Sequence, residues 1–168
     1  MASRAFDLAL TIKDFVAAWY DDVSNGLADD EALPARRFVT LGLPPVDCDE
    51  FCVAIEGVVP IAGDANVTVL PTDSDPVGFW MRAAVMGIWI FRCWPTLDDS
   101  GNPPPVDDEE AATQLIMDDF DRFERILGEA FAAGELPGCG GFAFVGTELV
   151  TPEGGFGGGV LRCQVSME

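Results

Sequence analysis

The sequence predicts an α/β (α+β) fold, in which a mainly antiparallel or mixed central sheet is flanked by an N-terminal helix and one long helix. Three observations lead to this prediction. One long apolar segment has the pattern of a buried strand, two segments repeat their apolar residues every three or four positions, and the chain ends in two alternating stretches. A length of 168 residues is typical of one domain, so we expect a single domain over residues 1–168.

The most apolar segment, residues 79–94 (FWMRAAVMGIWIFRCW), predicts the central strand of the sheet. Its even and odd positions are both largely apolar, as in a strand that is covered on both faces. The uncharged run between Arg82 and Arg92 has nine residues, far fewer than the roughly 20 that a membrane-spanning helix needs. Gly87, in the middle of the segment, predicts a bulge or bend.

The N-terminal helix is predicted over residues 6–23, before the Asn25-Gly26 stop signal. We expect this helix to cover one face of the central strand. Its apolar stripe consists of Leu8, Ile12, Phe15, Trp19 and Val23.

The long helix is predicted from Asp107, which reads as an N-cap with Glu110 three residues later, to the stop at Gly134. It spans about 25 residues, close to 38 Å. We expect its stripe to cover the other face of the central strand. That stripe consists of Ile116, Phe120, Phe123, Leu127, Ala130 and Phe131.

The remaining strands are shorter and are bounded by turn residues. We expect strands at residues 37–43 and 51–59, a short edge piece at 65–71, and a loop at 71–78. Residues 142–150 and 160–167 predict a hairpin with a long glycine-rich connection. Residues 96–107, rich in proline and acids, predict a loop that is either an exposed connection or an arm that docks on a neighbour.

The charge of the chain excludes two classes of partner. With 29 acidic and 9 basic residues the net charge is −20, which argues against nucleic-acid binding through phosphate neutralisation and against an anionic membrane surface. A hydrophobic content of 49 % indicates a folded protein rather than an acidic disordered tail.

The five cysteines are expected to be free, mostly buried thiols in a reducing compartment. Their number is odd, and Asp7 and Lys13 stand where a secretory signal would have its apolar core. Cys48 and Cys52 have a spacing found in metal sites, but a closed zinc site needs four ligands and the chain has no histidine. We therefore expect no metal.

The sequence carries no arrangement typical of an enzyme. Histidine, the commonest general base, is absent, so a serine or cysteine nucleophile lacks its usual partner. The glycine run at residues 154–159 lacks phosphate-loop spacing and precedes a strand. Paired acids such as Asp118-Asp119 are expected on solvated faces, and a cation site from Asp98, Asp99 and Asn102 lacks the EF-hand spacing. We expect no catalytic residue and no cofactor.

The order of motifs along nearly the whole chain resembles that of the tail terminator proteins of long-tailed (siphovirus-like) phages that infect actinobacteria. A helix is followed by four motifs, with the long helix before the last of them. They are PARRFV (34–39), VDCDEFCV (46–53), IFRCWP (90–95) with DDSGNPP after it, and PEGGFGGGVLRCQV (152–165).

The resemblance implies a structural virion protein rather than an enzyme. Such a protein forms a homo-oligomeric ring, expected to be a hexamer, at the head-proximal end of the tail tube, ends tube polymerisation, and joins the tail to the head connector. Its partners are further copies of itself, the tail tube protein and the head-side connector or stopper protein, and it assembles in the host cytoplasm. A ring of six carries a charge of about −120, so acids lining the bore would let genomic DNA pass without specific binding.

Two other functions stay open from the sequence. One is another neck component, a head-to-tail stopper or adaptor, and the other is a small acidic soluble binding protein. The residues expected at interfaces are Asp98, Asp99, Asn102, Pro103, Pro104, Pro105, Glu153, Gly155, Phe156, Arg82 and Arg92. For the two arginines, a partner acid in the same chain and one in a neighbouring subunit are both open.

Overall fold

The computed structural model describes residues 4–45, 47–62, 80–153 and 155–167. The edge piece predicted at residues 65–71 and the loop at 71–78 lie outside these ranges. The elements are α1 (Arg4–Asp21), η1 (Val23–Asn25), η2 (Asp29–Glu31), β1 (Arg36–Leu41), β2 (Glu50–Ala62), β3 (Trp80–Cys93), α2 (Val106–Ala133), β4 (Cys139–Glu153) and β5 (Phe156–Met167). The η elements are single 3-10 turns.

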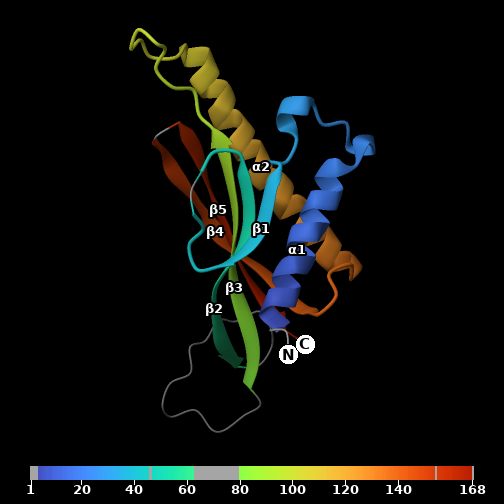
Figure 1. Ribbon diagram of the computed structural model, residues 1–168. Coiled ribbons are helices and arrows are strands. Elements are labelled where there is room, and N and C mark those ends of the chain that lie inside the picture. Colours follow the sequence, from blue (N-terminus) through green and yellow to red (C-terminus); the bar gives the residue numbers. More distant parts are fainter. Residues whose placement is uncertain (1–3, 46, 63–79, 154, 168) are drawn as a thin grey trace.

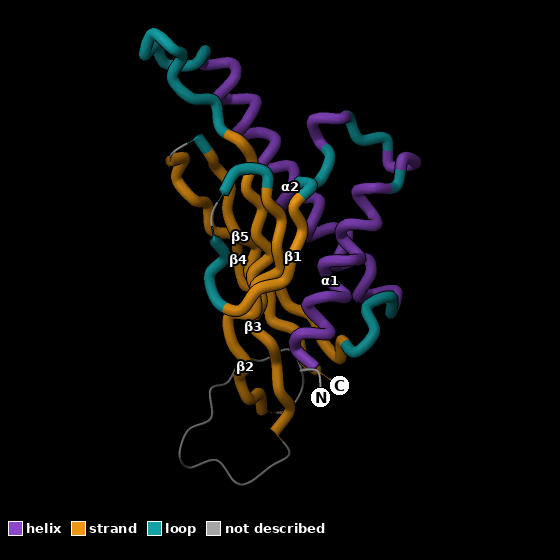
Figure 2. The backbone as a smooth tube through the Cα atoms, viewed as in Figure 1, coloured by secondary structure: helices purple, strands orange, loops and turns teal. Residues whose placement is uncertain are grey.

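The five strands form one mixed sheet in the order β1-β2-β3-β5-β4 (Figure 2). Only β1 and β2 are parallel, and the three other pairs are antiparallel. The prediction of a mixed sheet with an N-terminal helix and one long helix is therefore confirmed. So is the central place of residues 79–94, because β3 lies between β2 and β5.

Both helices lie on the same face of the sheet, with α1 over β1 and β2 and α2 over β3, β5 and β4 (Figure 1). The expectation that the two helices cover opposite faces is wrong. On the helix-covered face, even residues of β3 such as Met86, Ile88 and Ile90 pack with Phe123 and Leu127 of α2 in the main core. A smaller cluster on the opposite face is built from Cys52, Ala54, Trp89, Phe91 and Val160, with Phe38, Val150 and Phe156 packed against it.

The buried stripe of α1 is rotated relative to the prediction. Leu8 and Ile12 are buried as expected, but the stripe continues through Val16 and Tyr20. Phe15 and Trp19 are only partly buried, and Val23 is 94 % exposed. The reason is that α1 ends at Asp21, so Val23 belongs to a separate 3-10 turn.

The long helix α2 begins earlier than predicted and ends where expected. Its N-cap residue is Pro105, which makes no side-chain cap hydrogen bond, and Asp107 lies inside the first turn instead of capping it. The predicted capping box is therefore wrong, although acids in the first turn do complement the helix dipole. Gly134 ends the helix in the left-handed region at φ 74°, as predicted. Among the described residues, no helix is long and apolar enough to span a membrane.

The irregularity predicted at Gly87 lies instead on the neighbouring strand. The register between β2 and β3 shifts between Ile55 and Gly57, so Glu56 is the extra residue of the bulge. Gly87 itself lies in regular register. Its lack of a side chain leaves space for the side chains of Trp89 and Glu56. A Cβ atom at Gly87 would lie 2.5 Å from Nε1 of Trp89 and 2.6 Å from Oε1 of Glu56.

The C-terminal hairpin has a short turn rather than a long glycine-rich connection. Strands β4 and β5 extend to Glu153 and Phe156, so Gly157, Gly158 and Gly159 lie inside β5. These three glycines permit close packing. A Cβ atom at Gly157 would lie 2.6 Å from the Trp94 ring, and one at Gly159 would lie 2.5 Å from the carbonyl oxygen of Glu148.

Two of the five cysteines form a disulfide, so the expectation of five free thiols is wrong. The bond joins Cys48, in the connection that leads from β1 to β2, to Cys93 at the end of β3, and their Cα atoms are 4.6 Å apart. The connection is thereby fixed to the central strand. The other three cysteines form no disulfide: Cys52 and Cys163 are buried thiols, and Cys139 is a half-buried thiol.

Candidate interface site

The structure brings together the two segments that the sequence marks as interface candidates. The loop that follows β3 and the turn between β4 and β5 meet near one end of the sheet, beside the start of α2 (Figure 1). The backbone N–H of Trp94 donates to the carbonyl oxygen of Gly155 at 2.8 Å. A groove of about 480 Å³ lies between the two segments. It is lined by Trp94, Pro95, Thr96, Leu97, Pro103, Pro104, Glu109, Pro152 and Gly155.

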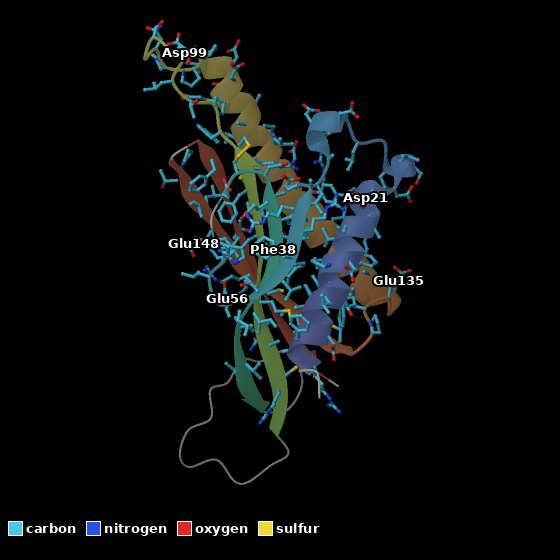
Figure 3. All side chains as sticks on the ribbon, in the orientation of Figure 1. Asp21, Phe38, Glu56, Asp99, Glu135 and Glu148 are labelled. Carbon is cyan, nitrogen blue, oxygen red and sulfur yellow. A yellow bond between two sulfur atoms is a disulfide. The ribbon has the colours of Figure 1, made fainter. Side chains whose placement is uncertain are left out.

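The tip of the loop is built by Asp98. Its Oδ1 accepts hydrogen bonds from the backbone N–H groups of Ser100 and Asn102, both at 2.8 Å, and its Oδ2 accepts one from the Asn102 side chain at 2.9 Å. These bonds, the Asn102 side chain first, hold the pKa of Asp98 below its ordinary value. Asp98 and Asn102 therefore shape the loop, and the neighbouring Asp99 is exposed to solvent (Figure 3).

Neither cation hypothesis finds a ligand set in the structure. Asp98 uses both carboxylate oxygens inside its own turn. Cys48 is bonded to Cys93 and is not available to act with Cys52. Across the described ranges, no group of three or more cysteine or acidic side chains could hold a metal ion.

The other predicted interface residues divide between the two ends of the molecule. Phe156 packs edge-to-face on Phe91, with ring centroids 6.0 Å apart, and anchors the hairpin turn to the sheet. The side chain of Glu153 lies outside the described residues. Arg82 is exposed near the other end of β3, ten residues from Arg92 and therefore about 33 Å away along the strand.

Arg92 is buried and has its partner in the same chain. Its guanidinium forms an ion pair with Asp119 of α2, with a closest nitrogen–oxygen distance of 2.9 Å. Its Nη1 also donates to the carbonyl oxygen of Ala32 at 2.6 Å. Of the two partners that the sequence leaves open, the structure shows the one within the chain.

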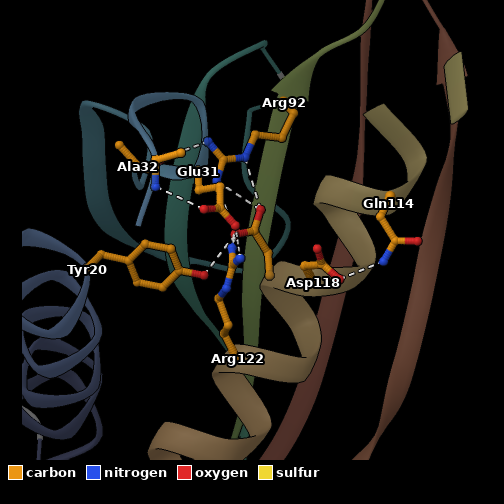
Figure 4. A network of polar contacts seen from close by, with 9 residues as sticks. Tyr20, Glu31, Ala32, Arg92, Gln114, Asp118 and Arg122 are labelled. Carbon is orange, nitrogen blue, oxygen red and sulfur yellow. Dashed lines mark hydrogen bonds and ion pairs between the residues drawn. The ribbon is translucent and has the colours of Figure 1, made fainter. Parts of the chain in front are cut away.

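A buried polar network that the sequence analysis did not predict joins Tyr20, Arg92 and Arg122 (Figure 4), and Asp119 is its centre. Its side chain is fully buried and accepts a hydrogen bond of 2.8 Å from the Tyr20 hydroxyl, in addition to those from Arg92. Arg122 lies 3.7 Å from the same carboxylate and also pairs with Glu31. The network joins α1, η2, β3 and α2 at one point.

Burial dominates the electrostatics of this network. It raises the pKa of Asp119, against the opposing attraction of Arg92 and the Tyr20 hydrogen bond. Burial and the nearby Asp119 carboxylate also raise the pKa of Tyr20. The expectation that Asp119 sits on a solvated face is wrong. Its spacing gives the signal, because it lies three residues after Ile116 and four before Phe123, within the buried stripe.

Exposed apolar side chains mark both edges of the sheet. On β4, at one edge, Val145 is 65 % and Leu149 is 56 % exposed. At the other edge, Leu41 ends β1 with 76 % exposure, and Leu43 follows it with 74 %. Edge strands of this kind are sites of association with other chains.

The fold and the site define a mixed-sheet α+β domain whose distinctive features are edges, loops and grooves. Comparison of the chain with protein-family models and with curated proteins gives no match.

Proposed function

We propose that this chain is a tail terminator, the subunit of a ring that closes the head-proximal end of a phage tail tube. The resemblance of motif order along the sequence supports the assignment to a tail. The exposed apolar residues on the two opposite sheet edges support the ring, and they are the structural observation that carries the proposal.

Two different surfaces on opposite edges suit a head-to-tail contact. When the edge of one copy meets the other edge of the next, the contact is heterologous, and it closes into a ring if the rotation between copies permits. Here the β4 edge around Val145 would face the β1 edge around Leu41 of the next copy. Both edges are then covered, which also removes the aggregation risk of open strands.

The charge of the chain supports a lumen that does not bind DNA. A net charge of −20 per subunit makes the ring strongly acidic, and acids that line the bore repel phosphate. The genome then passes through the ring without specific binding. A neutral or basic lumen in the assembled ring contradicts this part of the proposal.

The proposal is tested by introducing an amber mutation into this gene in the phage that encodes it. Loss of the terminator leaves tube polymerisation without its stop, so non-suppressing hosts should yield tails longer than normal that are not joined to heads. A suppressing host is the control and should restore joined tails of normal length.

The same experiment separates the other neck roles. A stopper or adaptor mutant should yield tails of normal length that fail to join, because tube length is then still controlled. A normal yield of infectious particles would contradict any structural role in the tail and would favour a soluble binding protein.

A further inference from the structure

A second groove lies between α2 and the β4–β5 hairpin, next to the interface loop. Its volume is about 280 Å³, and its walls include Trp94, Ile116, Met117, Leu149 and Pro152. It shares Trp94 and Pro152 with the groove under the loop, so the two hollows adjoin. The volume is just below the range of about 300–1,000 Å³ typical of small-molecule sites, which suits a few apolar side chains of a partner.

The two segments that line this groove are acidic and carry no lysine or arginine. Residues 93–121 and 139–161 include neither lysine nor arginine. The first turns of α2 carry Asp107, Asp108, Glu109 and Glu110, and all but Glu109 are exposed. Asp107 is six residues before Thr113, which lines the groove, so these acids lie about 9 Å along the helix from it. Glu109 itself lines the adjoining hollow.

A second copy of the chain is poorly suited to this surface. Among the described residues, at least seven cations form ion pairs with acids of their own chain, namely Lys13, Arg36, Arg37, Arg92, Arg122, Arg125 and Arg162. At this surface, the acids of the α2 N-terminus would need cations that a second copy already uses in its own ion pairs. Charge complementarity therefore requires a different protein.

We propose that this groove and its acidic border form a docking surface for a segment of another protein that places one or two large apolar side chains among lysines or arginines. The apolar side chains fill the groove against Met117 and Leu149, and the cations face the acids of the α2 N-terminus. This inference goes beyond the proposed ring, because it concerns a contact with a different protein, and it is tested on the free chain.

The test is selection of binding peptides from a random 12-residue peptide library presented by mRNA display, with the folded full-length chain as bait. The expected consensus has lysine or arginine around one or two large apolar residues. A selected peptide is then measured by fluorescence polarisation. L149S should weaken its binding at least tenfold, which corresponds to about 1.4 kcal/mol, because the apolar contact with the peptide is lost.

Matched variants separate docking from general attraction of cations. V23S replaces another exposed apolar side chain, in η1, to which no contact is assigned, and should leave the affinity unchanged. D107N/D108N should weaken binding and reduce its dependence on salt, whereas D29N/D30N, which removes two exposed acids in η2, should not. If L149S does not fold, M117S replaces it, because Met117 is also partly exposed in the groove.

The proposal would be overturned by a selection without consensus or by a consensus that is neutral or acidic. It would also be overturned by peptides that bind L149S and the original chain equally. A consensus that reproduces a stretch of this chain would also overturn it, because the occupant would then be a second copy.

Discussion

Arg92 and Asp119 form a buried ion pair that fixes the central strand to the long helix, with a nitrogen–oxygen distance of 2.9 Å. The side chain of Asp119 is fully buried and that of Arg92 is 8 % exposed. Since Tyr20 and Arg122 contact the same carboxylate, the polar contacts of α1, β3 and α2 depend on one acid. A buried charge without its partner is strongly destabilising, and this leads to the first prediction.

Asp119→Ala should lower the free energy of unfolding by about 3–5 kcal/mol, because Arg92 is left buried without its counterion. Asp118→Ala is the matched control, since its side chain only accepts a bond from Gln114 on the solvent side, and it should change stability by less than about 0.5 kcal/mol. Urea denaturation measures both.

The double variant Arg92→Met/Asp119→Leu distinguishes an ion-pair effect from loss of packing. It should recover much of the stability lost in Asp119→Ala, because apolar replacements of similar volume remove both charges together. A double variant as unstable as the single one would contradict this account.

The second prediction concerns the glycines of β5. Gly158→Ala should destabilise the fold by at least about 3 kcal/mol, because the new Cβ would overlap the backbone carbonyl of Ile90 on β3. Gly57→Ala on β2 is the control, since nothing lies within 4 Å of its Cβ position. Thermal unfolding of the two variants measures the difference in stability. Equal melting temperatures would contradict the close approach of β5 to β3 at Gly158.

The third prediction concerns the cysteines. Under native, non-reducing conditions Cys139 should react with a thiol reagent at pH 8 while Cys52 and Cys163 stay protected. Both protected thiols are buried, and desolvation raises the pKa of Cys52 to about 12 and also raises that of Cys163. Unfolding without reductant should expose three thiols, and unfolding with reductant five.

The Cys48–Cys93 bond should also contribute to stability. It closes a loop with a sequence separation of 45, for which the chain-entropy model gives about 4 kcal/mol. Cys48→Ser/Cys93→Ser should lower the free energy of unfolding by an amount of this order. Finding five reactive thiols in the unfolded protein without reductant would contradict the disulfide.

The fourth prediction concerns pH. The Arg37 side chain donates two hydrogen bonds to Asp21 and lowers the pKa of that carboxyl from its ordinary 3.8. A lowered pKa in the folded state gives stability that is present above pH 3.8 and is lost as the pH falls through the folded value. Arg37→Gln should raise the pKa of Asp21 in carboxyl ¹³C NMR titrations.

Arg125→Gln is the control for this titration. It removes a more exposed cation that pairs with Glu129, and it should leave the Asp21 titration unchanged. An Asp21 pKa that does not respond to Arg37→Gln would mean that the two side chains are not paired in solution.

The fifth prediction concerns the ring. In complementation of the amber phage, Val145→Asp should fail to restore joined tails, because it places a charge on the apolar β4 edge. Val23→Asp adds the same charge at a 94 % exposed position away from the sheet edges and should complement normally. Complementation by both variants would mean that the β4 edge contacts no other subunit.

Much of the fold can be predicted from local sequence patterns. The predictions that were wrong concern features that depend on contacts between residues distant in sequence. The apolar run around Ile88 predicts β3, and the stripe around Phe123 predicts α2, because the spacing of apolar residues indicates which side chains are buried. The spacing of apolar residues does not indicate on which face of the sheet α1 packs. That face depends on contacts such as that of Tyr20 with Asp119, 99 residues apart.

The sequence marks the two segments that form the candidate site, but it does not show that they contact one another. The proline-rich loop and the glycine-rich hairpin are visible in the sequence, but nothing local brings Trp94 to Gly155. From the sequence, the glycines of residues 154–159 suggest a flexible connection. In the structure, Gly157 instead leaves room for the ring of Trp94, which lies where a Cβ atom would be. The disulfide was likewise hidden, because Cys48 and Cys93 are 45 residues apart and an odd number of cysteines favoured free thiols.

The central claim is that this chain closes the tail tube as a ring, and electron cryomicroscopy of the neck of the assembled particle tests it most directly. We expect a closed ring at the head-proximal end of the tube, with six copies of this five-stranded fold joined through their β1 and β4 edges. A neck map in which every ring is built from other chains, with this fold absent, would contradict it.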